Sequence, residues 1–172
     1  MTDQNRGPRA RHTYVITGGA MKDEEERPAP IRPSGTLTVD AAKCSGCRTC
    51  EMACSLIHEG VVIPALARLT VRHDVFHEDH PTVLVCPQCL GPECLLACPQ
   101  GAIGVDEKTG ARVVDEERCD GCGICVKACH LGMIHLEPRS KKAYKCDLCG
   151  GRPACVEYCP QAVISYKPVR DS

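Results

Sequence analysis

The amino-acid sequence predicts an α+β fold built from short β-hairpins and short helical turns, and three observations lead to this prediction. Short alternating apolar runs are separated by turn residues, as in hairpins. Sixteen of the 172 residues are cysteine, and they recur in four similar groups. The chain has one Phe, four Tyr and no Trp, too little aromatic material for a conventional core of this size. We therefore expect bound groups anchored by the cysteines to fill the interior.

The four cysteine groups share one pattern. Each opens with C-x-x-C and ends with C-x-x-x-C, the gap between these parts varies from two to five residues, and no cysteine is left over. The groups are Cys44, Cys47, Cys50 and Cys54; Cys86, Cys89, Cys94 and Cys98; Cys119, Cys122, Cys125 and Cys129; and Cys146, Cys149, Cys155 and Cys159.

This spacing favours iron–sulfur clusters over the other uses of paired cysteines. Three thiolates in a C-x-x-C-x-x-C turn wrap one face of a [4Fe–4S] cubane, and the fourth cysteine reaches the second cluster of a pair. A zinc site needs only two C-x-x-C pairs and leaves the recurring third cysteine unexplained. Disulfides require an oxidising compartment, and the N-terminus has no export signal. The sequence thus predicts four [4Fe–4S] clusters, with a zinc-stabilised interaction protein as the alternative.

The predicted elements follow in chain order. The alternation in "TLTV" predicts an edge strand before the first group. The segment "AIGVDEKTGARVVD" predicts a hairpin around Lys-Thr-Gly, and "MIHLEPRSKKAYKC" predicts another around Pro138 to Lys142. The segment "AVISYKP" predicts a last strand. We expect a short helical turn after the third cysteine of each group, as in "CLLAC" and "CVEYC".

Three histidines lie between the first two groups, in "ARLTVRHDVFHEDHPTVLV". On a helix, His73, His77 and His80 would align as a metal site needs. The flanking "LTV" and "TVLV" instead favour a hairpin with a polar, solvated turn.

Composition divides the chain into three parts. Residues 1–35, rich in Arg, Pro and charge, predict an arm that is partly disordered or docks on a partner, with a short strand at "TYVITGGA". Residues 36–168 form the predicted cluster domain, and 169–172 a tail.

No segment has the apolar length of a membrane span, so we expect a cytoplasmic protein. The net charge of -1 suggests no nucleic-acid partner.

From Leu37 to Pro168 the chain resembles the four-cluster ferredoxin-like electron-transfer subunits of multisubunit oxidoreductases. The resemblance implies two bicluster ferredoxin-like units, with the unit of the second and third cysteine groups inserted into that of the first and fourth. It also implies how the ligands pair, which spacing alone does not give. The implied sets are Cys44, Cys47, Cys50 and Cys159; Cys54, Cys146, Cys149 and Cys155; Cys86, Cys89, Cys94 and Cys129; and Cys98, Cys119, Cys122 and Cys125.

The stretch "CSGCRTCEMACSLIHEGVVIPALARLTV" looks most like the branch that serves tungsten-dependent aldehyde oxidoreductases. This resemblance implies a non-catalytic subunit that relays single electrons between a tungsten or molybdenum pterin catalytic subunit and an FAD-containing partner linked to NAD or ferredoxin. Related branches serve carbon monoxide dehydrogenase, formate dehydrogenase and hydrogenases. An electron-transfer subunit with clusters at both ends suggests two or more partners, and it allows a head-to-tail contact with a second copy.

Few residues outside the cysteine groups suggest chemistry. Glu51, Glu59 and Glu157 are candidate acid–base groups, but the simpler expectation is that they are surface carboxylates. His130 follows Cys129 where the second and fourth groups carry Pro99 and Pro160. Because histidine has a backbone N–H that proline lacks, it could donate to a cluster sulfur or to the Cys129 thiolate. The alternative is that His130 merely occupies a permissive turn.

Overall fold

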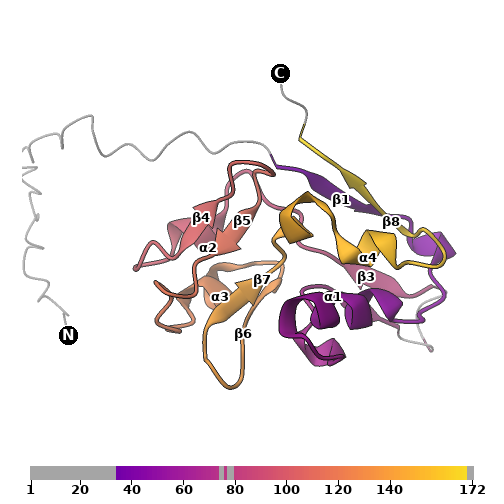
Figure 1. Ribbon diagram of the computed structural model, residues 1–172, viewed down its shortest axis with the longest axis horizontal. Helices are drawn as coiled ribbons and strands as arrows, with labels where there is room; N and C mark the ends of the chain where they lie inside the picture. The colour runs from indigo at the N-terminus through magenta and orange to yellow at the C-terminus, as the bar shows by residue number, and fades with distance from the viewer. Residues whose placement is uncertain (1–33, 74–75, 77–79, 170–172) are drawn as a thin grey trace, which may run out of the picture.

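The computed structural model describes residues 34–73, 76 and 80–169 of the chain. In this part, eight short strands form four two-stranded antiparallel sheets, and four helices lie among them (Figure 1). The predicted α+β class is therefore confirmed. The strands are β1 (Thr36–Val39), β2 (Thr70–Arg72), β3 (Thr82–Leu84), β4 (Ile103–Val105), β5 (Arg112–Val114), β6 (Ile134–Leu136), β7 (Ala143–Lys145) and β8 (Ile164–Lys167). The helices are α1 (Thr49–Glu59), α2 (Glu93–Leu96), α3 (Ile124–Ala128) and α4 (Ala154–Glu157).

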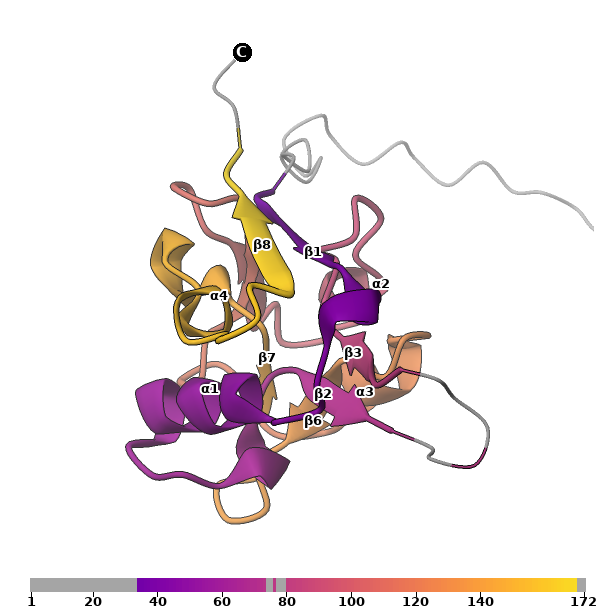
Figure 2. The ribbon, with the colours of Figure 1, turned by 90° about the vertical axis from the view of Figure 1, so that its right-hand side faces the viewer.

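The first and last strands pair with each other. In the antiparallel β1–β8 sheet, Thr36 lies opposite Lys167 and Val39 opposite Ile164 (Figure 2). The alternation of "TLTV" explains the pairing, because Leu37 points into the core while Thr36 and Thr38 are exposed. The two ends of the described domain are thus held side by side.

The other three sheets are the local hairpins β2–β3, β4–β5 and β6–β7, each in antiparallel register. They confirm the hairpins predicted at "AIGVDEKTGARVVD" and "MIHLEPRSKKAYKC". The hairpin predicted around the three histidines is also confirmed, since β2 and β3 are its arms. Its turn falls largely outside the described residues, as do most of the predicted arm, its "TYVITGGA" strand and the tail.

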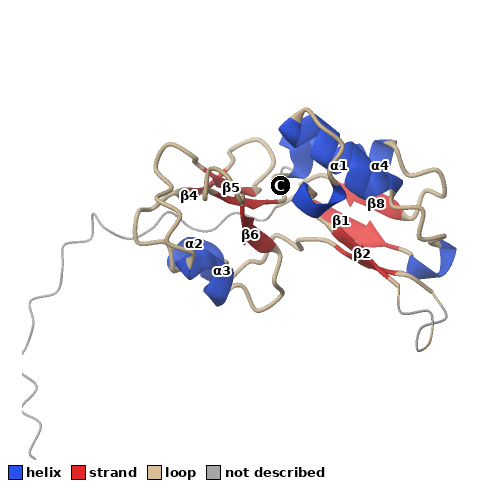
Figure 3. Cartoon of the chain, turned by 90° about the horizontal axis from the view of Figure 1, so that it is seen from below, coloured by secondary structure: helices blue, strands red, loops and turns tan. Residues whose placement is uncertain are grey.

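Buried residues form two core clusters, one mainly from the two ends of the chain with Ala111 from its middle, and one from the middle alone. The first cluster contains Leu37, Cys50, Cys54, Ala67, Leu69, Val83, Ala111, Leu148, Cys155, Val163 and Ile164. The second contains Ala102, Ile103, Cys119, Cys125, Ile134 and Ala143. Figure 3 shows the corresponding elements, with α1, α4, β1 and β8 on one side and α2, α3, β4 and β5 on the other.

Helix α1 is longer than the single turn expected from the sequence. It has eleven residues, whereas α2, α3 and α4 have four or five. Ser55 takes the place where the second and fourth groups carry proline, so the helix continues past the cysteine. Ser55 is fully buried, and its hydroxyl donates to the Met52 carbonyl and accepts from the Ile63 N–H, each at 3.1 Å. The helix ends at Gly60, which adopts the left-handed conformation of a C-terminal cap.

Candidate iron–sulfur cluster sites

All sixteen cysteines are free thiols, and they line four cavities with four cysteines each. We name them by their thiols: the first cavity has Cys44, Cys47, Cys50 and Cys159; the second has Cys54, Cys146, Cys149 and Cys155; the third has Cys86, Cys89, Cys94 and Cys129; and the fourth has Cys98, Cys119, Cys122 and Cys125. The structure thus brings together the four sets that the family resemblance implied.

Each helix, together with the residues just after it, lies between two cavities and supplies one cysteine to each. Helix α1 carries Cys50 of the first cavity and Cys54 of the second. Helix α4 and the residue that follows its cap supply the same two cavities in the opposite order. Helices α2 and α3 do the same for the third and fourth cavities. The C-x-x-x-C spacing therefore separates neighbouring cysteines between two sites.

Backbone N–H groups point at the last cysteine of every group. The Sγ atoms of Cys98 and Cys159 each accept from the amide four residues later, at 3.3 Å, and that of Cys129 does so at 3.4 Å. In the first group, where the helix continues, the Arg68 N–H reaches Cys54 Sγ at 3.2 Å instead. Such donors stabilise a thiolate and a cluster bound to it.

Burial holds several of these thiols in their protonated form while no metal is bound. Desolvation raises the pKa of Cys50 and Cys54 to about 11 and that of Cys146 to about 12. It also raises the pKa of Cys155, which the nearby Cys146, Cys54 and Cys149 raise further. Four clustered thiols in an apolar hollow resist ionisation until a cation replaces their protons. Sulfur donors, N–H groups aimed at sulfur and enclosed hollows fit a [4Fe–4S] cluster.

The comparisons with known proteins agree with this geometry. Residues 81–168, just over half of the chain, match the family model of a 4Fe–4S dicluster domain. The polyferredoxin-like subunit of an aliphatic sulfonate oxidoreductase from Pyrococcus furiosus is 49% identical over 129 residues, covering 73% of this chain and 72% of that protein. The chain therefore belongs to the family of 4Fe–4S dicluster domain proteins. It is a non-catalytic iron–sulfur subunit that transfers electrons in oxidoreductase complexes and carries multiple [4Fe–4S] clusters.

Other members of the family are similar over most of this chain. The electron transport protein HydN of Escherichia coli is 37% identical over 146 residues, covering 72% of this chain and 82% of HydN. The β subunit of the NADH-dependent phenylglyoxylate dehydrogenase of Aromatoleum evansii is 33% identical over 136 residues, covering 78% of this chain and 30% of that subunit. A solved active-site complex BamBC of benzoyl coenzyme A reductase is 28% identical over 77% of this chain and 78% of its own, with a TM-score of 0.46. None of the helices in the described part of this ferredoxin-like chain is long and apolar enough to cross a membrane.

Sequence reasoning missed two aspartates that shape the cysteine turns. The carboxylate of Asp120 accepts from the Cys122 N–H at 3.0 Å, and that of Asp147 accepts from the Cys149 N–H at 2.9 Å. Both bonds close an Asx turn inside C-x-x-C. The signal was present in the sequence, because both groups read C-D-x-C.

His58 was also missed. Its Nε2 lies 3.4 Å from Cys149 Sγ and 3.5 Å from the Asp147 carboxylate, at the edge of the second cavity. No spacing rule connects His58 to Cys149, because 91 residues separate them in the sequence.

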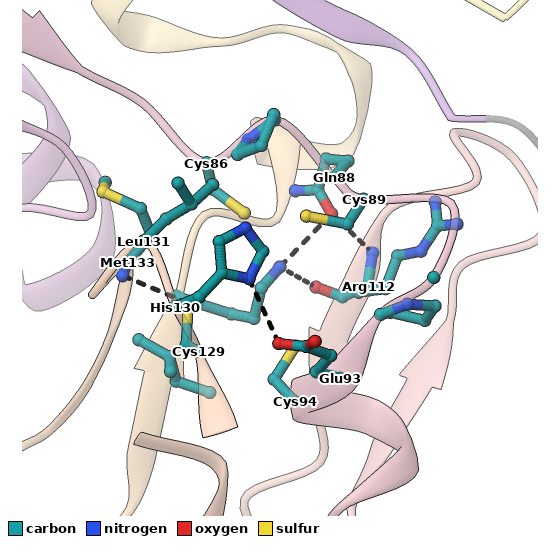
Figure 4. Close-up of a pocket in the computed structure, with 15 residues that line it drawn as sticks. Cys86, Gln88, Cys89, Glu93, Cys94, Arg112, Cys129, His130, Leu131 and Met133 are labelled. Carbon is teal, nitrogen blue, oxygen red and sulfur yellow. Dashed lines mark hydrogen bonds and ion pairs between the residues drawn. The ribbon is translucent and has the colours of Figure 1, made fainter. Parts of the chain in front are cut away.

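The structure corrects the expectation for Glu51 and answers the question about His130. Glu51 is buried, not on the surface, because it faces β2, where its carboxylate accepts from the Val71 N–H at 2.8 Å and pairs with Arg48. The N–H that donates to Cys129 Sγ belongs to Met133, and not to His130. The His130 imidazole lies at the rim of the third cavity, 3.1 Å from the exposed Glu93 carboxylate (Figure 4).

Proposed function

We propose that this chain holds four [4Fe–4S] clusters and relays single electrons through them between a catalytic oxidoreductase subunit and a second redox partner. The observation that carries the proposal is the collection of all sixteen thiols into four cavities of four. The ligands of each cluster would be the four cysteines of one cavity. Each bound cluster supplies reversible one-electron chemistry, since four cysteine ligands leave no iron open to substrate.

We further propose that the second and third cysteine groups form a unit inserted into one made by the first and fourth. The β1–β8 pairing supports this architecture, because it joins the segments before the first group and after the last. The two core clusters support it as well, since one draws on both ends of the chain and takes only Ala111 from the middle, while the other draws on the middle alone.

The elements between cavities suggest a linear order for the relay. Helices α1 and α4 connect the first cavity to the second, and α2 and α3 connect the third to the fourth. The second and third cavities meet at Gln88, which lies between two cysteines of the third cavity and donates to the Cys146 carbonyl of the second at 2.7 Å. Electrons would enter at one outer cavity and leave at the other.

For the partners we propose a tungsten or molybdenum pterin catalytic subunit and an FAD-containing subunit linked to NAD or ferredoxin. The resemblance of the first cysteine group to the aldehyde oxidoreductase branch supports this proposal, which includes a reducing, cytoplasmic location. The Pyrococcus furiosus relative, named as a subunit of a sulfonate oxidoreductase, supports a broader range of catalytic partners.

Metal analysis tests the cluster proposal. The full chain, purified anaerobically, should contain about sixteen iron and sixteen acid-labile sulfide per chain, as four cubanes require. About four zinc per chain without sulfide would instead support the zinc-stabilised alternative.

Isolation of the native complex tests the partner proposal. An affinity-tagged copy expressed in the native host should co-purify with a pterin-containing subunit and a flavoprotein. Recovery of this chain alone, or only with a second copy of itself, would contradict the proposed relay between partners.

A further inference from the structure

Two cationic side chains are buried among the described residues, and both line the third cavity. Arg112 is 1% exposed and Lys145 is 5% exposed. Figure 4 shows the four cysteines of this cavity together with Gln88 and Arg112. Burying a cation is costly unless the surroundings supply donors, acceptors or an opposite charge. The third cavity therefore differs electrostatically from the others.

The ammonium of Lys145 is fixed in place by three acceptors. Its Nζ donates to the Arg112 carbonyl at 2.6 Å, the Cys146 carbonyl at 2.9 Å and the Gln88 side-chain oxygen at 3.2 Å. These bonds use all three N–H groups of an ammonium. Because every acceptor is an uncharged oxygen, the bonds hold the positive charge without neutralising it.

This charge acts on thiols of two cavities. Lys145 lowers the pKa of Cys94 in the third cavity and of Cys146 in the second, against the larger effect of burial. Arg112 adds charge of the same sign, and the thiols of Cys89, Cys86 and Cys94 oppose the lowering of its pKa by burial. The one carboxylate that lines the third cavity, Glu93, is 58% exposed and paired with His130.

The cations near the other cavities either lie beside a carboxylate or are partly exposed to solvent. At the first cavity, Arg48 is 55% exposed and pairs with Glu51. At the second, Arg68 is 12% exposed, lies 3.7 Å from the Glu59 carboxylate and shares the cavity lining with Asp147. The charged residue that lines the fourth is Asp120, an anion, and the half-buried Lys142 nearby donates to the Cys119 carbonyl. An unneutralised cation shielded from water acts far more strongly than one at the surface.

We propose that Lys145 raises the reduction potential of the cluster held by Cys86, Cys89, Cys94 and Cys129 and thereby makes it the first of the four to be reduced. When bound there, the cluster would accept one electron from a reduced flavin or ferredoxin partner and go from the 2+ to the 1+ state. The buried ammonium stabilises the added negative charge, so it lowers the free energy of the reduced state relative to the oxidised state. The inference rests on the ligand sets of the proposed function.

The test is a potentiometric titration of the anaerobically purified full chain, followed by EPR. Lys145→Gln keeps a hydrogen-bonding side chain and removes the charge, Lys145→Arg keeps the charge, and Lys127→Gln removes an exposed charge on α3 as the matched control. Of the three variants, only Lys145→Gln should lower the highest midpoint potential. The expected decrease is about 59 mV for one electron, which corresponds to about a tenfold decrease in the equilibrium constant for reduction. An unchanged highest midpoint in Lys145→Gln, with full iron content, would overturn the inference.

A second measurement does not depend on the folding of that variant. In the otherwise unchanged chain, Cys94→Ser should alter or abolish the EPR signal that appears at the highest potential, whereas Cys47→Ser in the first cavity should leave that signal unchanged. The opposite assignment would contradict the inference and leave the four-cluster proposal standing. Unmodified protein without about sixteen iron per chain would instead contradict the four-cluster proposal itself.

Discussion

At the scale of single residues, the structure buries several charged side chains whose burial the sequence did not predict. Glu51, Arg112 and Lys145 are all buried, although charged residues are normally exposed. Each is held by hydrogen bonds: the Glu51 carboxylate accepts from the Val71 N–H in β2, and the Arg112 guanidinium donates to the Gly110 carbonyl. The Lys145 ammonium donates to three oxygens. The bonds of Glu51 and Lys145 connect parts of the chain 20 to 57 positions apart, a relation that no local sequence pattern records.

Glu51 is expected to stabilise the contact between α1 and β2. Replacing it with alanine leaves the Val71 N–H without its acceptor, which should cost about 1–3 kcal/mol of unfolding free energy. The urea concentration at which cluster absorbance is lost, measured anaerobically, reports the change. Glu157→Ala, at a carboxylate 54% exposed, is the control and should shift stability by less than about 0.5 kcal/mol. Equal midpoints for both variants would contradict a structural role for Glu51.

Gly121 is expected to be required by the turn of the third cysteine group. It has a φ of 77°, and a Cβ there would lie 2.5 Å from the Lys141 carbonyl oxygen. Gly121→Ala should therefore reduce iron content, with the loss confined to the fourth cavity and approaching four iron per chain. Gly101→Ala carries similar φ strain with open space around its Cβ, so it separates strain from steric clash. Comparable iron loss in both variants would show that the clash is unimportant.

At the scale of elements, the four cysteine repeats differ in the residue after the last cysteine, and the helices differ accordingly. The cysteine before His130 is already extended, with φ -77° and ψ 99°, whereas Cys54 lies inside α1. A proline disfavours a helical residue before it and accepts an extended one. The same substitution should therefore have opposite consequences in the two repeats.

His130→Pro should be tolerated, and Ser55→Pro should not. In His130→Pro only an exposed ion pair is lost, a change of at most about 1 kcal/mol. Proline in the interior of α1 should cost about 3 kcal/mol or more. Anaerobic urea unfolding of the two variants in parallel checks this, and a Ser55→Pro variant as stable as His130→Pro would contradict it.

Short elements were predictable from the sequence, whereas the length of α1 was not. The strands in "TLTV", "AIGVDEKTGARVVD", "MIHLEPRSKKAYKC" and "AVISYKP" appear because alternation and turn residues are local signals. Grouping of the cysteines by spacing was likewise local. How the cysteines are distributed among the cavities is not a local signal, because the first cavity combines Cys44 with Cys159. Only the family resemblance implied that set.

At the scale of the whole molecule, the pairing of β1 with β8 supports the core that contains the first and second cavities. Leu37 belongs to this core and lines the second cavity. Leu37→Ala should lower the unfolding free energy by about 2–5 kcal/mol and weaken iron retention in the first two cavities.

Its neighbour supplies the control for that substitution. Thr38 is exposed on the same strand, so Thr38→Ala should change stability by less than about 0.5 kcal/mol. Loss of cluster absorbance during urea unfolding measures both variants. EPR signals lost equally from all four sites in Leu37→Ala would indicate that the two core clusters do not behave as separate units.

The same pairing sets an order in which the sites can be completed during protein synthesis. The cysteines of the third and fourth cavities all lie within residues 86–129, so these thiols are present before the last cysteine group is made. The first and second cavities need Cys159 and Cys155, and their core needs Ile164 of β8, all of which are synthesised after residue 129. The third and fourth sites can therefore bind metal before the last cysteine group, which the first and second sites require, has been synthesised.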